Sequence, residues 1–66
     1  MKLTPREREV ITLVAKGYID KEISVKLKIS ARTVQSHIKF AMAKLQARNR
    51  SNAVAILLSK KFIRKN

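Results

Sequence analysis

Apolar residues recur at helical spacing between residues 31 and 46. They occupy positions 34, 38, 41, 42 and 45, which is the i, i+4, i+7, i+8, i+11 spacing of one helix face. At 100° per residue these positions fall within roughly 100° of arc. The pattern predicts a helix over residues 31–46 that buries one side and exposes the other.

A second helix is predicted over residues 5–16. Thr4 precedes Pro5, a favoured first helical residue, and Glu7 stands three residues after Thr4, as a capping box requires. Gly17 marks its end, because glycine readily adopts the left-handed conformation that closes a helix. The helix over residues 5–16 therefore has defined signals at both ends.

Two more helices are predicted over residues 21–28 and 52–61. The link between residues 28 and 31 is too short for anything but a steep crossing, as in a helix-turn-helix. The expected class is therefore all-α, a four-helix bundle containing a helix-turn-helix, in a single domain over residues 1–66. Three polar residues are expected to cap the later helices: Asp20, Ser30 and Ser51.

The last predicted helix is apolar nearly all round. Ala53 and Leu57 can cover the core, which leaves Val54 and Leu58 as a second stripe. An exposed stripe of this kind is most simply a dimer surface against the same helix of a second copy. The alternative is that a small core uses both stripes. The C-terminal end of the chain is a basic tail that is expected to contact phosphates or to fray: Lys60, Lys61, Arg64 and Lys65.

Charge is distributed unevenly along the chain. The net charge is +12 over 66 residues. Residues 1–22 hold five basic and four acidic residues, whereas residues 23–66 hold eleven basic residues and no acidic one. A surface without carboxylates attracts a polyanion, and nucleic acid is the commonest one in a cell.

Several classes of function are disfavoured by the composition. Without cysteine there is no disulfide and no thiolate zinc site, which fits a reducing cytoplasm. The expected location is cytoplasmic, with nucleoid association if the chain binds DNA. No apolar run approaches the roughly 20 residues of a membrane span. Ser36 and His37 are neighbours on a helix and do not face each other, so an enzyme is not expected. No cofactor or metal is expected either, and His37 is interpreted as a packing residue.

The exposed side of the helix over residues 31–46 is rich in hydrogen-bond donors. It carries Arg32, Gln35, Ser36 and Lys39, with the small Ala43. An α-helix fits the major groove, where Arg and Lys donate to guanine and Gln pairs with adenine. The simpler interpretation is an ordinary solvated face. The tight turn before this helix and the missing acids favour base recognition.

Five segments of the chain together form a specific pattern: LTPREREV, KEISVKLKIS, TVQSHI, KL and NRSNAVAILL. By this pattern the chain resembles the LuxR-type (FixJ/NarL/GerE-like) helix-turn-helix family over about residues 3–63. The resemblance implies a bacterial DNA-binding transcription regulator whose third helix enters the major groove. It also implies that the fourth helix is a scaffold and often a dimer surface.

The resemblance also implies roles for individual residues. Gln35, Ser36 and Lys39 occupy base-facing positions, and Arg32 is added to them from the polar face. Glu7 is interpreted as structural. Four residues are expected to contact the DNA backbone: Lys21, Thr33, Lys44 and Arg50.

The chain departs from the family pattern at several positions. Gln46 and Lys61 replace common glycines, so the helix before Gln46 is expected to run on or to be strained. Ser24 replaces a usual alanine. Phe40 replaces a common polar residue, and we expect it to pack on the chain's own helices, the alternative being a sugar or a thymine methyl.

The expected partners are double-stranded DNA, a second copy of the chain at least on DNA, and RNA polymerase. Rival interpretations are a promoter module similar to region four of a sigma factor, a protein-interaction module with incidental charge, and a cationic helix at a membrane surface. The chain is interpreted as either a free-standing regulator or a fragment of a longer one.

Overall fold

The computed structural model describes the backbone of residues 2–65 and the side chains of residues 2–59. Its helices are α1 (Pro5–Ala15), α2 (Asp20–Leu27), α3 (Ala31–Leu45) and α4 (Arg50–Lys65), and this part of the chain contains no strand. The all-α prediction is confirmed. The fourth helix begins two residues earlier than expected and continues past residue 61.

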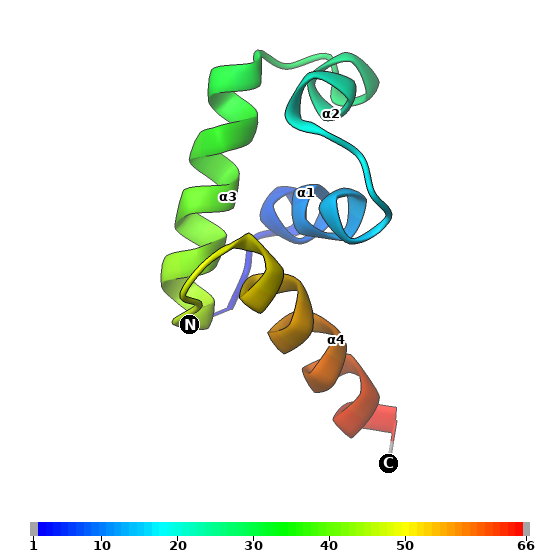
Figure 1. The fold of residues 1–66 in the computed structure, drawn as a ribbon, viewed down its shortest axis with the longest axis vertical. Helices are drawn as coiled ribbons and strands as arrows, with labels where there is room; N and C mark the ends of the chain where they lie inside the picture. The colour runs from blue at the N-terminus through cyan, green and yellow to red at the C-terminus, as the bar shows by residue number, and fades with distance from the viewer. Residues whose placement is uncertain (1, 66) are drawn as a thin grey trace.

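Helix α3 forms one side of the molecule, and the other helices lie on its other side (Figure 1). Helix α1 runs away from α3, α2 lies beside the N-terminal end of α3, and α4 leads away from its C-terminal end. Helix α3 is packed against all three. One side of α3 is therefore available to build a site.

The core lies where the four helices meet. Ile11, Ile23, Val10 and Val34 are the largest fully buried side chains. Full burial of such a side chain stabilises the fold by about 1.5–3 kcal/mol. The remaining buried apolar residues of the described part are Leu13, Ile38, Ala41, Leu45, Ala53 and Leu57.

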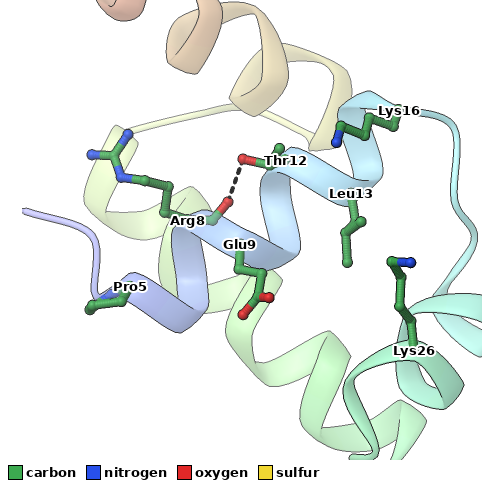
Figure 2. A pocket seen from close by; sticks show the side chains of 7 residues that line it. All are labelled: Pro5, Arg8, Glu9, Thr12, Leu13, Lys16 and Lys26. Carbon is green, nitrogen blue, oxygen red and sulfur yellow. Dashed lines mark hydrogen bonds between the residues drawn. The ribbon is translucent and has the colours of Figure 1, made fainter.

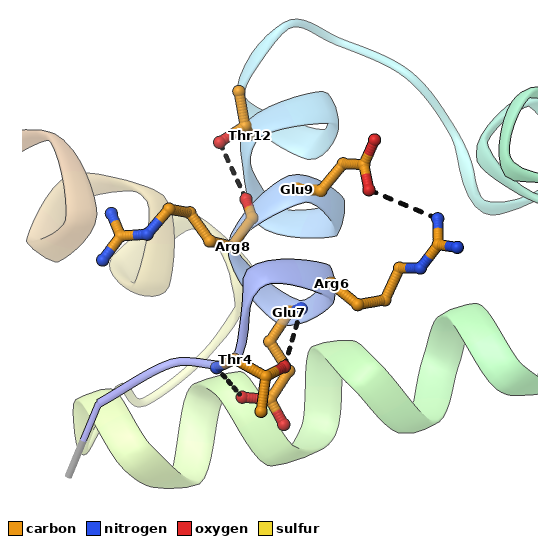
Figure 3. Close-up of polar contacts among 6 residues, drawn as sticks. All are labelled: Thr4, Arg6, Glu7, Arg8, Glu9 and Thr12. Carbon is orange, nitrogen blue, oxygen red and sulfur yellow. Dashed lines mark hydrogen bonds and ion pairs between the residues drawn. The ribbon is translucent and has the colours of Figure 1, made fainter.

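The start of α1 has the predicted capping box. The backbone N–H of Glu7 donates to Oγ1 of Thr4 at 3.1 Å, and the N–H of Thr4 donates to Oε1 of Glu7 at 2.9 Å (Figure 3). Ser30 also caps α3 as predicted, since its Oγ accepts from the N–H of Thr33 at 3.0 Å.

Two of the predicted caps are wrong. The residue before α2 is Ile19, whose N–H donates to Oε1 of Glu22 at 2.9 Å, while Asp20 is already helical and pairs with Arg50 instead. Helix α4 begins before Ser51, because Oδ1 of Asn49 accepts from the N–H of Asn52 at 2.8 Å. In both cases a neighbouring side chain satisfies the free N–H groups.

Helices α1, α2 and α3 end in the same hydrogen-bonded motif. In each, the backbone N–H of the residue after the left-handed position donates to the carbonyl five residues back: Tyr18 to Leu13, Ile29 to Ser24 and Ala47 to Met42. The left-handed positions are Gly17 (φ 96°), Lys28 (φ 59°) and Gln46 (φ 56°). Of the two expectations for Gln46, the strained turn holds, since α3 stops at Leu45.

Candidate nucleic-acid interface

The helix-turn-helix corner consists of α2, residues 28–30 and α3. Lys28 reverses the chain in its left-handed conformation, and Ser30 then starts α3. Ile23 and Val34 are both fully buried and anchor the two helices to the core. These contacts fix the exposed side of α3 relative to the rest of the domain.

The exposed side of α3 carries the residues that the sequence pattern assigned to it. All four candidate base-contacting side chains are exposed: Arg32, Gln35, Ser36 and Lys39. Ala43 is exposed on the same side, one turn beyond Lys39. The side chains of Ser36 and Ala43 are themselves small, and the larger Phe40 lies between them on the helix surface.

Two candidate backbone contacts lie near the helix starts of this corner. Lys21 is exposed in the first turn of α2. Thr33 is half-buried, and its Oγ1 accepts from Oγ of Ser30 at 2.9 Å. Both lie in the first turn of a helix, where the partial positive charge of the helix N-terminus favours anionic groups.

Lys44 is held by an ion pair across the domain. Its Nζ lies 2.8 Å from Oε1 of Glu7, whose side chain is 7% exposed. The hydrogen bond from Lys44 lowers the pKa of Glu7, and it outweighs the opposing effect of burial. The pair joins α1 to the C-terminal half of α3, and the structural role expected for Glu7 is supported by this contact.

Arg50 is held in the same way at the start of α4. Its Nη2 donates to Oδ2 of Asp20 at 2.8 Å, and its Nη1 lies 2.7 Å from Oδ1. This contact with Arg50 is the main cause that lowers the pKa of Asp20, with a smaller contribution from Gln35, and it raises the pKa of Arg50.

Each of the four acidic side chains has an internal partner. Besides Glu7 and Asp20, Glu22 accepts from the N–H of Ile19, and Glu9 lies 3.2 Å from Nη1 of Arg6 (Figure 3). None of the four belongs to α3. The exposed side of α3 therefore presents donors without a carboxylate of its own.

Phe40 does not pack as expected. It is 57% exposed, because it lies about 200° around α3 from the buried Ile38. Its position is next to Lys39 and one turn beyond Ser36, on the side that no helix covers. The expectation of packing on the chain's own helices is wrong, and the periodicity of α3 contained the signal.

The two predicted dimer-surface residues of α4 differ in their surroundings. Val54 is half-buried and packs against the core, whereas Leu58 is 52% exposed. The second stripe is thus divided between the core and the surface. The side chains of the predicted basic tail lie outside the described residues.

A shallow groove follows the outer side of α1 (Figure 2). Its volume is about 470 Å³. The hydroxyl of Thr12 donates to the carbonyl of Arg8 at 2.7 Å, so its proton is already used within α1. The sequence pattern gave no sign of this groove, whose lining comes from α1, the residue after it and α2: Pro5, Arg8, Glu9, Thr12, Leu13, Lys16 and Lys26.

Across the described residues, no helix has the length and apolar content needed to cross a membrane.

Comparison with known proteins gives a consistent result. Residues 1–57 match the family described as bacterial regulatory proteins, luxR family. The oxygen regulatory protein NreC of Staphylococcus carnosus (strain TM300) is 41% identical over 61 residues, which cover 92% of this chain and 28% of that protein. NreC of Staphylococcus aureus (strain JH9) shows the same identity and coverage. The chain spans 28% of the length of these curated relatives.

Proposed function

The chain belongs to the luxR family of bacterial regulatory proteins, and on that premise we propose that it regulates transcription by sequence-specific binding of double-stranded DNA through α3. The observation that carries the proposal is the exposed side of α3. It combines Arg32, Gln35, Ser36 and Lys39 on a helix fixed by the helix-turn-helix corner. That match to the luxR family also favours this function over a sigma-factor module.

The proposed roles separate affinity from specificity. Contacts of basic side chains with phosphates supply most of the affinity, and contacts with base edges select the sequence. Lys39 and Arg32 donate to guanine, and Gln35 pairs with adenine. Lys21 and Thr33 contact the DNA backbone next to these bases.

Lys44 and Arg50 are proposed as weaker backbone contacts. Each is paired with a carboxylate in the free domain. A phosphate contact therefore requires either group to share or exchange its partner. Their contribution to affinity is expected to be smaller than that of Lys21, which has no such partner in the described residues.

The test is selection of bound sequences from random duplex DNA, followed by affinity measurements on the selected site and on unrelated DNA. Lys39→Ala or Gln35→Ala should weaken binding to the selected site by about 1–3 kcal/mol and to unrelated DNA by less. Lys16→Ala is the matched control, since Lys16 is exposed just after α1, away from α3. Equal losses on both DNAs would show that these residues contact phosphates only.

The same assay separates backbone contacts from base contacts. Lys21→Ala should weaken binding to both DNAs alike and reduce the slope of log affinity against log salt by about one. A loss confined to the selected site would contradict its role as a backbone contact.

Dimer formation is proposed to involve α4, with Leu58 at its centre. A two-fold repeat in the selected sequences, with half-sites about 34–36 Å apart, would support it. Leu58→Glu should then lower affinity for the paired site more than for a single half-site.

RNA polymerase is proposed as a further partner, to be tested by retention of the purified polymerase on the DNA-bound domain.

A further inference from the structure

Phe40 is an exposed aromatic residue on the polar side of α3. Its exposed fraction is 57%, and the other large exposed apolar residues of the described part, Ile19, Val25 and Leu58, lie outside α3. An exposed aromatic side chain keeps a large apolar area in water, which a partner can remove. The question is which partner reaches this side of α3.

The neighbours of Phe40 are the candidate base contacts. In a helix, residues three and four apart lie side by side, so Phe40 adjoins Ser36 on one side and Ala43 on the other. Its Cα lies about 6 Å along the helix axis from that of Ser36. A helix that brings Ser36 and Lys39 to base edges therefore brings Phe40 into the same groove.

The surrounding charge favours nucleic acid over a protein as the partner. Arg32 and Lys39 are exposed on this side, and α3 contains no acidic residue. In the major groove, only thymine presents an apolar group, its C5 methyl, and aromatic side chains contact that group. We propose that Phe40 is a specificity-determining residue that contacts a thymine methyl, an inference that rests on the proposed DNA-binding function.

The test removes single methyl groups from the DNA. Each thymine of the selected site is replaced in turn by deoxyuridine, which lacks only the C5 methyl, and dissociation constants are measured for the wild-type chain and for Phe40→Ala. At one thymine per half-site, we expect the wild type to lose about fourfold in affinity, the effect of one buried carbon. Phe40→Ala should bind the thymine site at least fourfold more weakly and should no longer distinguish thymine from deoxyuridine there.

Val25→Ala is the matched control, because Val25 is 72% exposed but lies on α2. It should keep the wild-type preference for thymine. Phe40→Ala should melt at the wild-type temperature, since the side chain is largely exposed. Multiplicative, independent losses from Phe40→Ala and from deoxyuridine would overturn the inference, as would a wild type that is indifferent to every methyl. A chain that selects no sequence at all would instead contradict the proposed function.

Discussion

The two sides of α3 have opposite relations to the rest of the domain. Val34 and Ile38 are buried against the other helices, whereas Gln35 and Lys39, each one residue further along, are exposed. The buried side determines where the helix is held, and the exposed side determines what it can contact. Stability and DNA recognition are therefore expected to depend on different residues of the same helix.

The largest effect that would test this separation is expected on the buried side of α3. Ile38 is 3% exposed, and Ile38→Ala should destabilise the domain by about 2–5 kcal/mol through lost burial and the cavity left behind. A domain of this size has only about 3–10 kcal/mol of stability. Urea denaturation followed by circular dichroism measures the loss.

If Ile38→Ala does not fold, Ile38→Val replaces it in the stability and DNA-affinity measurements. It should cost about 0.5–1.5 kcal/mol and leave the ratio of specific to nonspecific DNA affinity unchanged. A folded variant with altered sequence preference would break the separation of the two sides.

The next test concerns the ion pair at the edge between the two sides. Glu7→Gln keeps an acceptor for the N–H of Thr4 but removes the charge that Lys44 faces at 2.8 Å. The expected loss is about 1–3 kcal/mol, because a charge-assisted and largely buried contact is broken. The control is Glu9→Gln, which affects an exposed pair with Arg6 and should change stability by at most about 1 kcal/mol.

This ion pair also predicts the response to acid. The pKa values of Glu7 and Asp20 are lowered in the folded domain by Lys44 and Arg50. The unfolded chain therefore binds protons first as the pH falls, so stability is full above the ordinary carboxyl pKa values of 4.5 and 3.8 and declines below them. Denaturation midpoints measured from pH 7 to pH 3 should fall, and they should fall less steeply in Glu7→Gln. Equal slopes in both proteins would contradict the assignment.

Local signals in the sequence were sufficient for the helices and for the two sides of α3. The capping box of Thr4 and Glu7 and the cap at Ser30 join residues three apart, and such signals are visible in the sequence. The error at Ser51 is also local, because Asn49, two residues earlier, supplies the cap instead. The error at Asp20 has a different origin. Asp20 pairs with Arg50, thirty residues away, and no local pattern indicates which distant charge a carboxylate will meet.

The candidate site shows the same limit. The exposed positions of α3 followed from its periodicity, but the pairing of Lys44 and Arg50 with carboxylates did not. The size of the Phe40 side chain favours burial, but its angular position on α3 points it away from the core. The exposure of Phe40 shows that angular position outweighs residue size here.

The smallest expected effect lies just beyond α3, at Gln46. This residue is left-handed with φ 56°, which costs a residue with a Cβ about 1–2 kcal/mol. Glycine removes that strain but adds about 0.5–1 kcal/mol of backbone entropy to the unfolded chain. Gln46→Gly should therefore stabilise the domain by about 0.5–1 kcal/mol in urea denaturation.

Gly17 supplies the reverse experiment. It closes α1 with the same motif at φ 96°, and a Cβ added there meets no atom within 4 Å. A loss on Gly17→Ala would thus come from backbone conformation alone, and it should have the opposite sign to the gain on Gln46→Gly. Since Gln46 follows the last turn of α3 and belongs to neither side, Gln46→Gly should leave DNA affinity unchanged. Weaker binding by a more stable Gln46→Gly variant would mean that the strained turn itself sets the position of the recognition side.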